Sequence, residues 1–178
     1  HWVWSPKMQQ LARENDIEAY VLPGGVIMQL MREVAANRPG LITHVGLGTF
    51  VDPQQDGGRM NEAAVDPLVE RITIDGKDYL RYLPIPIDVA ILKGSCADEE
   101  GNISLDEEPA NLDIYAMAAA AHNSGGKVIF QVRKKVAAGS IPARSVRIPS
   151  AIVDAVVVDP EQRQSYELIY DPSISGER

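Results

Sequence analysis

The sequence is poor in cysteine and has no long apolar run. Its single cysteine, Cys96, can form no disulfide within the chain, which suits a reducing compartment, so we expect a cytoplasmic protein. We expect Cys96 to be a small buried side chain rather than a nucleophile. No apolar stretch approaches the roughly 18 residues that a membrane-spanning helix needs, and no signal peptide is recognisable. We therefore expect no membrane partner.

Positive charge is also scarce. The formal net charge is -8 and the sequence pI is near 4.9. The only basic run is Arg133-Lys134-Lys135, and such a short run is typical of a solvated strand end. A nucleic-acid-binding protein normally presents a basic patch, so we expect no nucleic-acid partner. Small anions remain compatible with this charge, because backbone N–H groups can bind them.

Several familiar catalytic and metal-binding motifs are missing. The sequence contains neither the G-x-S-x-G elbow of α/β-hydrolases nor a phosphate loop that ends in Gly-Lys-Ser/Thr. The three histidines, His1, His44 and His122, lie far apart and lack the spacing of metal ligands. We therefore expect no metal.

Acidic residues are plentiful but do not form a convincing catalytic pair. The runs 98–100 and 106–108 are typical of solvated turns or helix starts. Asp88 and Asp154 enter or interrupt apolar strands. We interpret them as caps of backbone groups and as weak site candidates.

What is present is typical of a globular α/β protein: 178 residues, 45% of them apolar and 24% charged. Ser5-Pro6 predicts a helix start, and Asp75-Gly76 predicts the turn of a β-hairpin over residues 70–84. Alternation and helical periodicity predict the other elements. The further strands are expected over 17–22, 42–45, 88–94, 127–132 and 151–158, and the further helices over 26–36 and 111–126.

These elements predict an open, largely parallel sheet flanked by helices, with an additional β-hairpin. The strand 17–22, the helix 26–36 and the strand 42–45 form a β-α-β unit in which we expect the strands to be parallel. We see no internal boundary and treat 1–178 as one domain, a piece of a longer chain, in which 171–178 begins a linker to a second half.

The helix at 111–126 is expected to pack closely on the sheet through a face rich in alanine. Gly125 is expected to end this helix. The face that we expect to be buried carries Leu112, Tyr115, Ala116, Ala119 and Ala120.

Two loops carry glycines directly after predicted strands: Pro23-Gly24-Gly25, and Gly46-Leu47-Gly48-Thr49 within "ITHVGLGTFVDP". The second loop is not a dinucleotide motif, because Asp52-Pro53 stands where a helix should begin. Two interpretations remain open. The loops are either tight turns that need glycine, or they line a small-molecule cleft at the carboxyl edge of the sheet, where the N-terminus of the following helix favours an anion.

The motifs as a set resemble the first-half domain of the class I coenzyme A transferases, most of all the single-chain acetate/propionate type. The resemblance covers essentially the whole chain. It is carried by "EAYVLPGGVIMQLMREVAANRPGLITHVGLGTFVDPQQDGGRMN", "PIDVAILKGSCADEEGNISL", "AHNSGGKVIFQV", "IPARSVRIPSAIVDAVVV" and "YDPSISGE".

The resemblance implies an enzyme built from two similar α/β halves. It would move coenzyme A, a substrate rather than a bound cofactor, from a short-chain acyl-CoA to a carboxylate. The route passes through a glutamyl-CoA thioester on the enzyme. It also implies no metal or redox cofactor and assembly as a homo-oligomer. The nucleophilic glutamate belongs to the second half, so neither Glu70 nor Glu99 is assigned that role, and we expect residues 1–178 alone to be inactive.

Residue by residue, the resemblance implies a wall of the substrate pocket. In the family the first loop typically reads Pro-Gln-Gly, and the glutamine helps to hold an oxyanion; here that place is taken by Gly24, followed by Gly25, so only a backbone N–H can donate. Gly46, Gly48 and Thr49 match the family's "GLGT" loop and would line the carboxylate pocket. The turn from Asp98 to Asn102 is expected to be structural.

Two other classes of function stay open at this point, because a shared fold does not settle function. One is a small-anion-binding sensor or a sugar-phosphate-isomerase-like domain of the same broad fold. The other is a structural interaction domain, which would show no dependence on coenzyme A.

Overall fold

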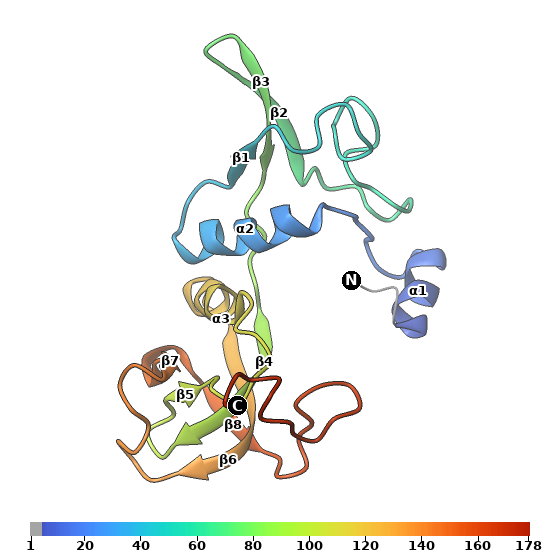
Figure 1. The fold of residues 1–178 in the computed structure, drawn as a ribbon. Helices are drawn as coiled ribbons and strands as arrows, with labels where there is room; N and C mark the ends of the chain where they lie inside the picture. The colour runs from blue at the N-terminus through green and yellow to red at the C-terminus, as the bar shows by residue number, and fades with distance from the viewer. Residues whose placement is uncertain (1–4) are drawn as a thin grey trace. The chain divides into compact units, whose positions relative to one another are not determined.

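The computed structural model describes residues 5–178, and their contacts divide the chain into two compact units (Figure 1). The first unit contains the described residues 5–34 and 38–85, and the second contains 35–37 and 86–178. The sequence shows no shift in composition at this division. The single domain that we expected over 1–178 remains a prediction. His1 lies outside the described residues.

The first unit contains a three-stranded antiparallel sheet in the order β1-β3-β2. The predicted helix start at Ser5-Pro6 is confirmed, because Ser5 caps the first helix and its hydroxyl accepts a hydrogen bond from the Met8 N–H at 3.4 Å. The elements of this unit are α1 (Pro6–Arg13), most of α2 (Gly24–Ala35), β1 (Leu41–Thr43), β2 (Val69–Ile74) and β3 (Lys77–Tyr82).

The predicted hairpin is confirmed as β2 and β3. Asp75 and Gly76 both have positive φ, 51° and 75°. This is the backbone of the tight two-residue turn whose twist matches that of the flanking strands. The register runs from Ile74 opposite Lys77 to Val69 opposite Tyr82.

The predicted β-α-β unit is wrong. Residues 17–22 form no strand apart from a single bridge between Tyr20 and Arg59, and β1 pairs antiparallel with β3. The extended segment is held by a loop instead: the Met60 N–H donates to Ala19 and the Val21 N–H donates to Gly58. Alternation along 17–22 thus reflected an extended, partly buried segment, and the pattern does not specify its hydrogen-bonding partner.

The second unit contains a five-stranded sheet in the order β7-β5-β4-β6-β8. The α/β class is confirmed. The sheet is mixed rather than largely parallel, because β4, β6 and β8 are parallel while β5 and β7 join antiparallel. The elements are β4 (Val89–Asp98), β5 (Ile103–Ser104), α3 (Ile114–Asn123), β6 (Lys127–Val136), β7 (Val146–Ile148), the short 3-10 helix η2 (Ser150–Ile152) and β8 (Ala155–Val158).

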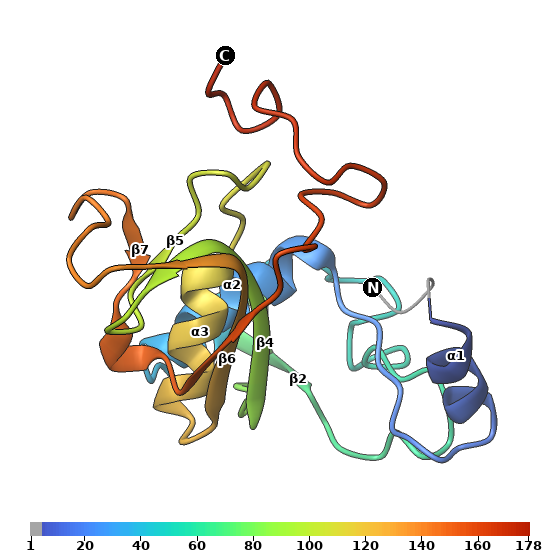
Figure 2. The same ribbon diagram turned by 90° about the horizontal axis from the view of Figure 1, so that it is seen from below.

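Helix α3 packs along one face of this sheet, as Figure 2 shows. The prediction that small residues face the sheet is confirmed, but the face is rotated from the expected one. Ala116 and Ala120 are buried as expected. Leu112 and Tyr115 are instead 76% and 58% exposed, and Ile114, Ala118 and Ala121 pack into the core of the sheet. The helix ends as predicted before Gly125, which has φ 77°. The central core residues of the sheet are Ile103, Val128, Phe130, Val132 and Ile148.

The segment after β8 is anchored by two buried glutamines. The Gln162 side-chain amide donates to the Gly94 carbonyl at 2.8 Å, and that of Gln164 donates to the Glu107 carbonyl at 2.7 Å. The Lys93 ammonium returns a bond to the Gln164 carbonyl at 2.7 Å. The linker over 171–178 remains a prediction. Within residues 5–178, no helix has both the length and the apolarity to cross a bilayer.

Candidate active site

The 46–49 loop is a compact turn that packs on the β1-β3-β2 sheet. Gly46 has φ 100°, and both the N–H and the hydroxyl of Thr49 donate to its carbonyl, at 3.0 and 2.8 Å. A side chain at Gly46 would run into Val51 and Tyr82. Gly48 and Thr49 are exposed, so the loop has a packed inner side and an accessible outer side.

Asp52 anchors this loop from inside the protein. Its side chain is completely buried, and one carboxylate oxygen, Oδ2, accepts the Gly48 N–H at 2.8 Å and Arg71 Nη1 at 3.0 Å. The other, Oδ1, accepts the Gln54 N–H at 3.0 Å. The Gly48 N–H is the largest cause that holds the pKa of Asp52 below its ordinary value. Burial opposes it, and the Gln54 N–H and the Arg71 guanidinium reinforce the lowering.

Tyr82, at the end of β3, packs against the buried side of the loop. Its ring is fully buried and its hydroxyl donates to the Val45 carbonyl at 2.8 Å. Burial, and then the charge of Asp52, raises the pKa of Tyr82 above its ordinary value. The hydroxyl therefore stays protonated and keeps its role as a donor.

The second predicted loop leads into α2. The N–H groups of Val26 and Ile27 both donate to the Pro23 carbonyl, at 2.9 and 3.1 Å. Gly24 and Gly25 are exposed, and no hydrogen bond within residues 5–178 uses their N–H groups. Two backbone donors at the positive end of a 12-residue helix are therefore available to an anion.

Gly58 joins the two loops, and sequence reasoning missed it. Its carbonyl accepts the Val21 N–H at 2.8 Å, close to the first loop, and its N–H donates to the Phe50 carbonyl at 2.9 Å, next to the second. A Cβ on Gly58 would lie 2.9 Å from the Val21 carbonyl oxygen, so only glycine fits. The Gly57-Gly58 pair in an otherwise polar loop was the available signal.

The two loops do not lie at the carboxyl edge of a parallel sheet. One follows an extended segment and the other follows a strand of an antiparallel sheet. The general rule for ligand sites in open α/β sheets therefore gives these loops no support. Their case rests on their own geometry.

The two loops differ in what they can offer to a ligand. In the second loop the N–H groups of Leu47, Gly48 and Thr49 all donate within the protein, to His44, Asp52 and Gly46. It can supply a shaped wall and the Thr49 side chain. No hydrogen bond within residues 5–178 uses the N–H groups of Gly24 and Gly25 in the first loop, or that of Gly46 in the second. The arrangement suits a carboxylate or an oxyanion held at the start of α2.

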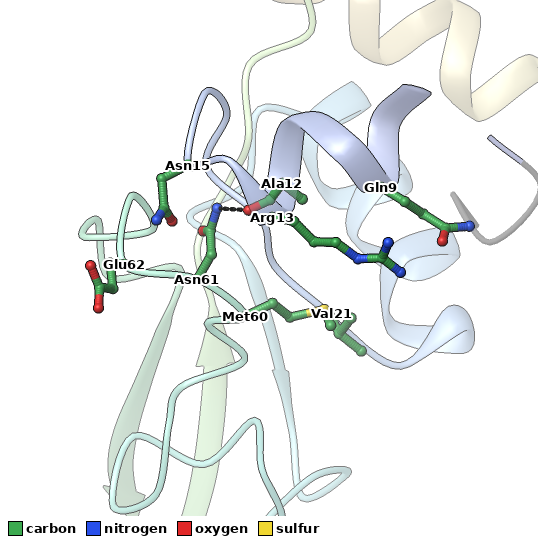
Figure 3. A pocket seen from close by; sticks show the side chains of 8 residues that line it. All are labelled: Gln9, Ala12, Arg13, Asn15, Val21, Met60, Asn61 and Glu62. Atoms are coloured by element: carbon green, nitrogen blue, oxygen red, sulfur yellow. Dashed lines mark hydrogen bonds between the residues drawn. The ribbon is translucent and has the colours of Figure 1, made fainter. Parts of the chain in front are cut away.

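A pocket of about 590 Å³ lies elsewhere in the first unit, between α1 and residues 60–62 (Figure 3). Asn61 closes one side of it, because its side-chain amide donates to the carbonyls of Ala12 and Ile17, both at 2.8 Å, and its oxygen accepts the Ala19 N–H. None of the predicted site residues lines this pocket. The lining consists of Gln9, Ala12, Arg13, Asn15, Val21, Met60, Asn61 and Glu62.

The remaining candidates from the sequence have structural roles or are solvated. His44 and His122 are exposed. Within residues 5–178, no group of three or more histidine, cysteine, aspartate or glutamate side chains could hold a metal ion. Cys96 is half-buried, and burial raises the pKa of its thiol, which opposes a role as nucleophile.

Two aspartates hold backbone groups, as the sequence analysis expected. Asp98 accepts the N–H groups of Glu100 and Asn102 and the Asn102 side-chain amide at 2.9 to 3.0 Å, so the 98–102 turn is structural. Asp154 accepts the Val128 N–H at 2.9 Å and pairs with Lys127 at 2.8 Å.

Residues 2–159 match the family described as Coenzyme A transferase. The chain belongs to the coenzyme A transferase family. It is 44% identical to the acetate CoA-transferase YdiF of Escherichia coli K12 over 166 residues, which are 93% of this chain and 31% of that protein. It is also 44% identical to the caffeate CoA-transferase of Acetobacterium woodii over 172 residues, 95% of this chain and 33% of that one.

The fold agrees with a solved structure of the same family. All of this chain superposes on 37% of the acyl-CoA transferase YdiF of E. coli O157:H7, in a thioester complex with CoA, with a TM-score of 0.95 and 42% identity. The chain thus spans about a third of the length of these relatives.

Proposed function

We propose that this chain is the first half of an enzyme that transfers coenzyme A from a short-chain acyl-CoA to a free carboxylate. The observation that carries the proposal is the superposition of the whole chain on an acyl-CoA transferase that holds a CoA thioester. Membership of the family over residues 2–159 supports the same reaction class. Coenzyme A enters as a substrate, and the proposal includes no metal or redox cofactor.

The reaction that we propose proceeds by covalent catalysis. A glutamate carboxylate from the second half attacks the thioester carbonyl, and the CoA thiolate leaves an acyl-glutamyl anhydride behind. The thiolate then attacks the glutamyl carbonyl, which releases the first carboxylate and forms a glutamyl-CoA thioester. The acceptor carboxylate then attacks the glutamyl-CoA thioester and releases the CoA thiolate, which leaves a new acyl-glutamyl anhydride. The thiolate attacks the acyl carbonyl of this anhydride, which forms the new acyl-CoA and frees the glutamate. Each step exchanges one acyl bond for another, so no oxidant or reductant is required.

In this scheme the described chain supplies part of the wall that faces the glutamate. The free N–H groups of Gly24 and Gly25 would stabilise the oxyanion that forms at the carbonyl under attack. Gly46, Gly48 and Thr49 would shape the pocket for the carboxylate substrate. The proposal further includes a cytoplasmic homo-oligomer in which a second half completes the site.

The test uses the complete polypeptide that contains this chain. We expect it to exchange coenzyme A between an acyl-CoA donor and acetate. After incubation with acyl-CoA alone, we expect borohydride to reduce one glutamate, which mass spectrometry would locate outside residues 1–178. We expect a purified 1–178 chain to show no turnover.

Turnover by residues 1–178 alone would contradict this division of labour. A complete polypeptide that binds small anions without exchanging coenzyme A would instead favour a sensor of the same fold. An absence of any dependence on coenzyme A or anions would favour an interaction domain.

A further inference from the structure

We propose that Asp52, held by Arg71, is a positioning residue that sets the shape of the 46–49 loop for the transfer reaction. The inference rests on the proposed function, because it assigns this loop to the carboxylate pocket. The Asp52 side chain does not reach the exposed outer face of the loop, because the residue is completely buried. Its effect is therefore indirect.

The contact that carries the inference is the one between Asp52 and Gly48. The carboxylate takes up the Gly48 N–H at 2.8 Å, so this donor points into the protein and not toward a ligand. The opposite side of Gly48 is exposed, and its φ of 71° lies in the left-handed region. The exposed Gly48 is thus held in place by a hydrogen bond to the buried, charged Asp52 carboxylate.

Arg71 offsets the cost of burying the Asp52 charge and links Asp52 to the β2–β3 hairpin. A buried carboxylate is costly unless it is paired and hydrogen-bonded. Arg71 Nη1 lies 3.0 Å from Asp52 and 2.7 Å from Gln54 Oε1, while Nη2 lies 2.8 Å from Asp78 on the neighbouring strand. The planar guanidinium donates to all three partners at once. It therefore fixes the position of the loop relative to the β2–β3 hairpin.

The pairing also matters for the substrate. A carboxylate substrate is an anion, and an unpaired Asp52 beneath its pocket would repel it. The adjacent guanidinium offsets that charge at a distance of 3.0 Å, and its second carboxylate partner, Asp78, is exposed, so water screens the charge of Asp78. Asp52 can therefore act as a strong acceptor for the loop without opposing the binding of an anion above it.

The experiment replaces Asp52 with Asn in the complete polypeptide. An asparagine oxygen in the place of Oδ2 can still accept from Gly48 and Arg71, but its NH₂ group then faces the Gln54 N–H, donor against donor, and the negative charge that pairs with Arg71 is lost. We expect kcat to fall about 10- to 100-fold, because a displacement of about 1 Å at a site of reaction has an effect of that size. We expect the KM for acyl-CoA to change little and the KM for the carboxylate to rise.

The matched control is Asp154→Asn in the second unit. Asp154 also accepts a backbone N–H and pairs with a cation, but it belongs to the second unit, directly before β8, whereas the loop belongs to the first. We expect this variant to lower the melting temperature and to leave kcat and both KM values of the folded enzyme unchanged. If Asp52→Asn behaves in the same way, its role is structural and the inference is overturned.

A second readout does not depend on activity. Hydrogen exchange of peptides that cover residues 44–52 is expected to become faster in Asp52→Asn, and in the milder Arg71→Lys, but not in Asp154→Asn. If the wild-type polypeptide transfers no coenzyme A, the proposed function fails. Unchanged exchange in the loop of both Asp52→Asn and Arg71→Lys overturns the positioning role, whatever the activity.

Discussion

Single residues of the 46–49 loop adopt backbone conformations that suit glycine. Gly46 has φ 100° and Gly48 has φ 71°, so both lie in the left-handed region. Their surroundings differ. A Cβ on Gly46 would lie 2.5 Å from the Tyr82 hydroxyl, whereas a Cβ on Gly48 would have no atom within 4 Å. The pair therefore separates backbone strain from steric overlap.

We predict that Gly46→Ala destabilises the protein more than Gly48→Ala. Both variants should lose roughly 1–2 kcal/mol to the left-handed conformation. Gly46→Ala should lose about 1–3 kcal/mol more, because the added methyl group overpacks the site against Tyr82. The melting temperatures of the two variants of the complete polypeptide provide the measurement. Equal shifts would show that the space around Gly46 adapts freely.

Among the elements, α3 shows how side-chain size sets the distance between a helix and a sheet. Ala118 and Ala121 are completely buried against the core that includes Phe130, whereas Ala119 is only half-buried. Leucine and alanine have similar helix propensities. The same substitution at the two positions therefore tests packing alone.

We predict that Ala118→Leu lowers the free energy of unfolding by about 1–3 kcal/mol, because a larger side chain has no space between α3 and the sheet. A shift of roughly 2–4 °C in melting temperature accompanies each kcal/mol for a domain of this size. Ala119→Leu is the control and should shift the melting temperature much less. If the two variants behave alike, α3 is free to move away from the sheet.

The molecule as a whole is acidic, yet several of its carboxylates are held in the charged form by close partners. The pKa values of three aspartates lie below the ordinary value. The largest cause is the Gly48 N–H for Asp52, the Asn102 side chain for Asp98 and the Lys127 ammonium for Asp154. A lowered folded-state pKa stabilises the fold wherever the carboxyl is ionised in both states.

We predict that stability is level above about pH 5 and declines below about pH 4, the ordinary pKa of aspartate. The sign follows from the lowered pKa values: the contribution is fully present above the unfolded pKa and is lost as pH falls through the folded one. Melting temperatures measured from pH 7 to pH 3 test this. Asp52→Asn should lie closest to the wild type at the acid end, and a constant difference at all pH values would contradict the assignment to Asp52.

Features that depend on neighbours in the chain could be predicted from the sequence. The Ser5 cap, the Asp75-Gly76 turn and the glycine after α3 were recognisable because each is a short-range requirement of the backbone. The family was recognisable for a related reason: its motifs are long and keep their order along the chain.

Other features depended on groups that are distant in sequence, and these came from the fold. The strand-like segment 17–22 meets a loop through Gly58, and the buried Asp52 meets Arg71, 19 residues further along. Hydrophobic periodicity reports that a residue is buried, but it does not name the partner. Long-range contacts alone therefore joined the two glycine loops and identified the charge that supports one of them.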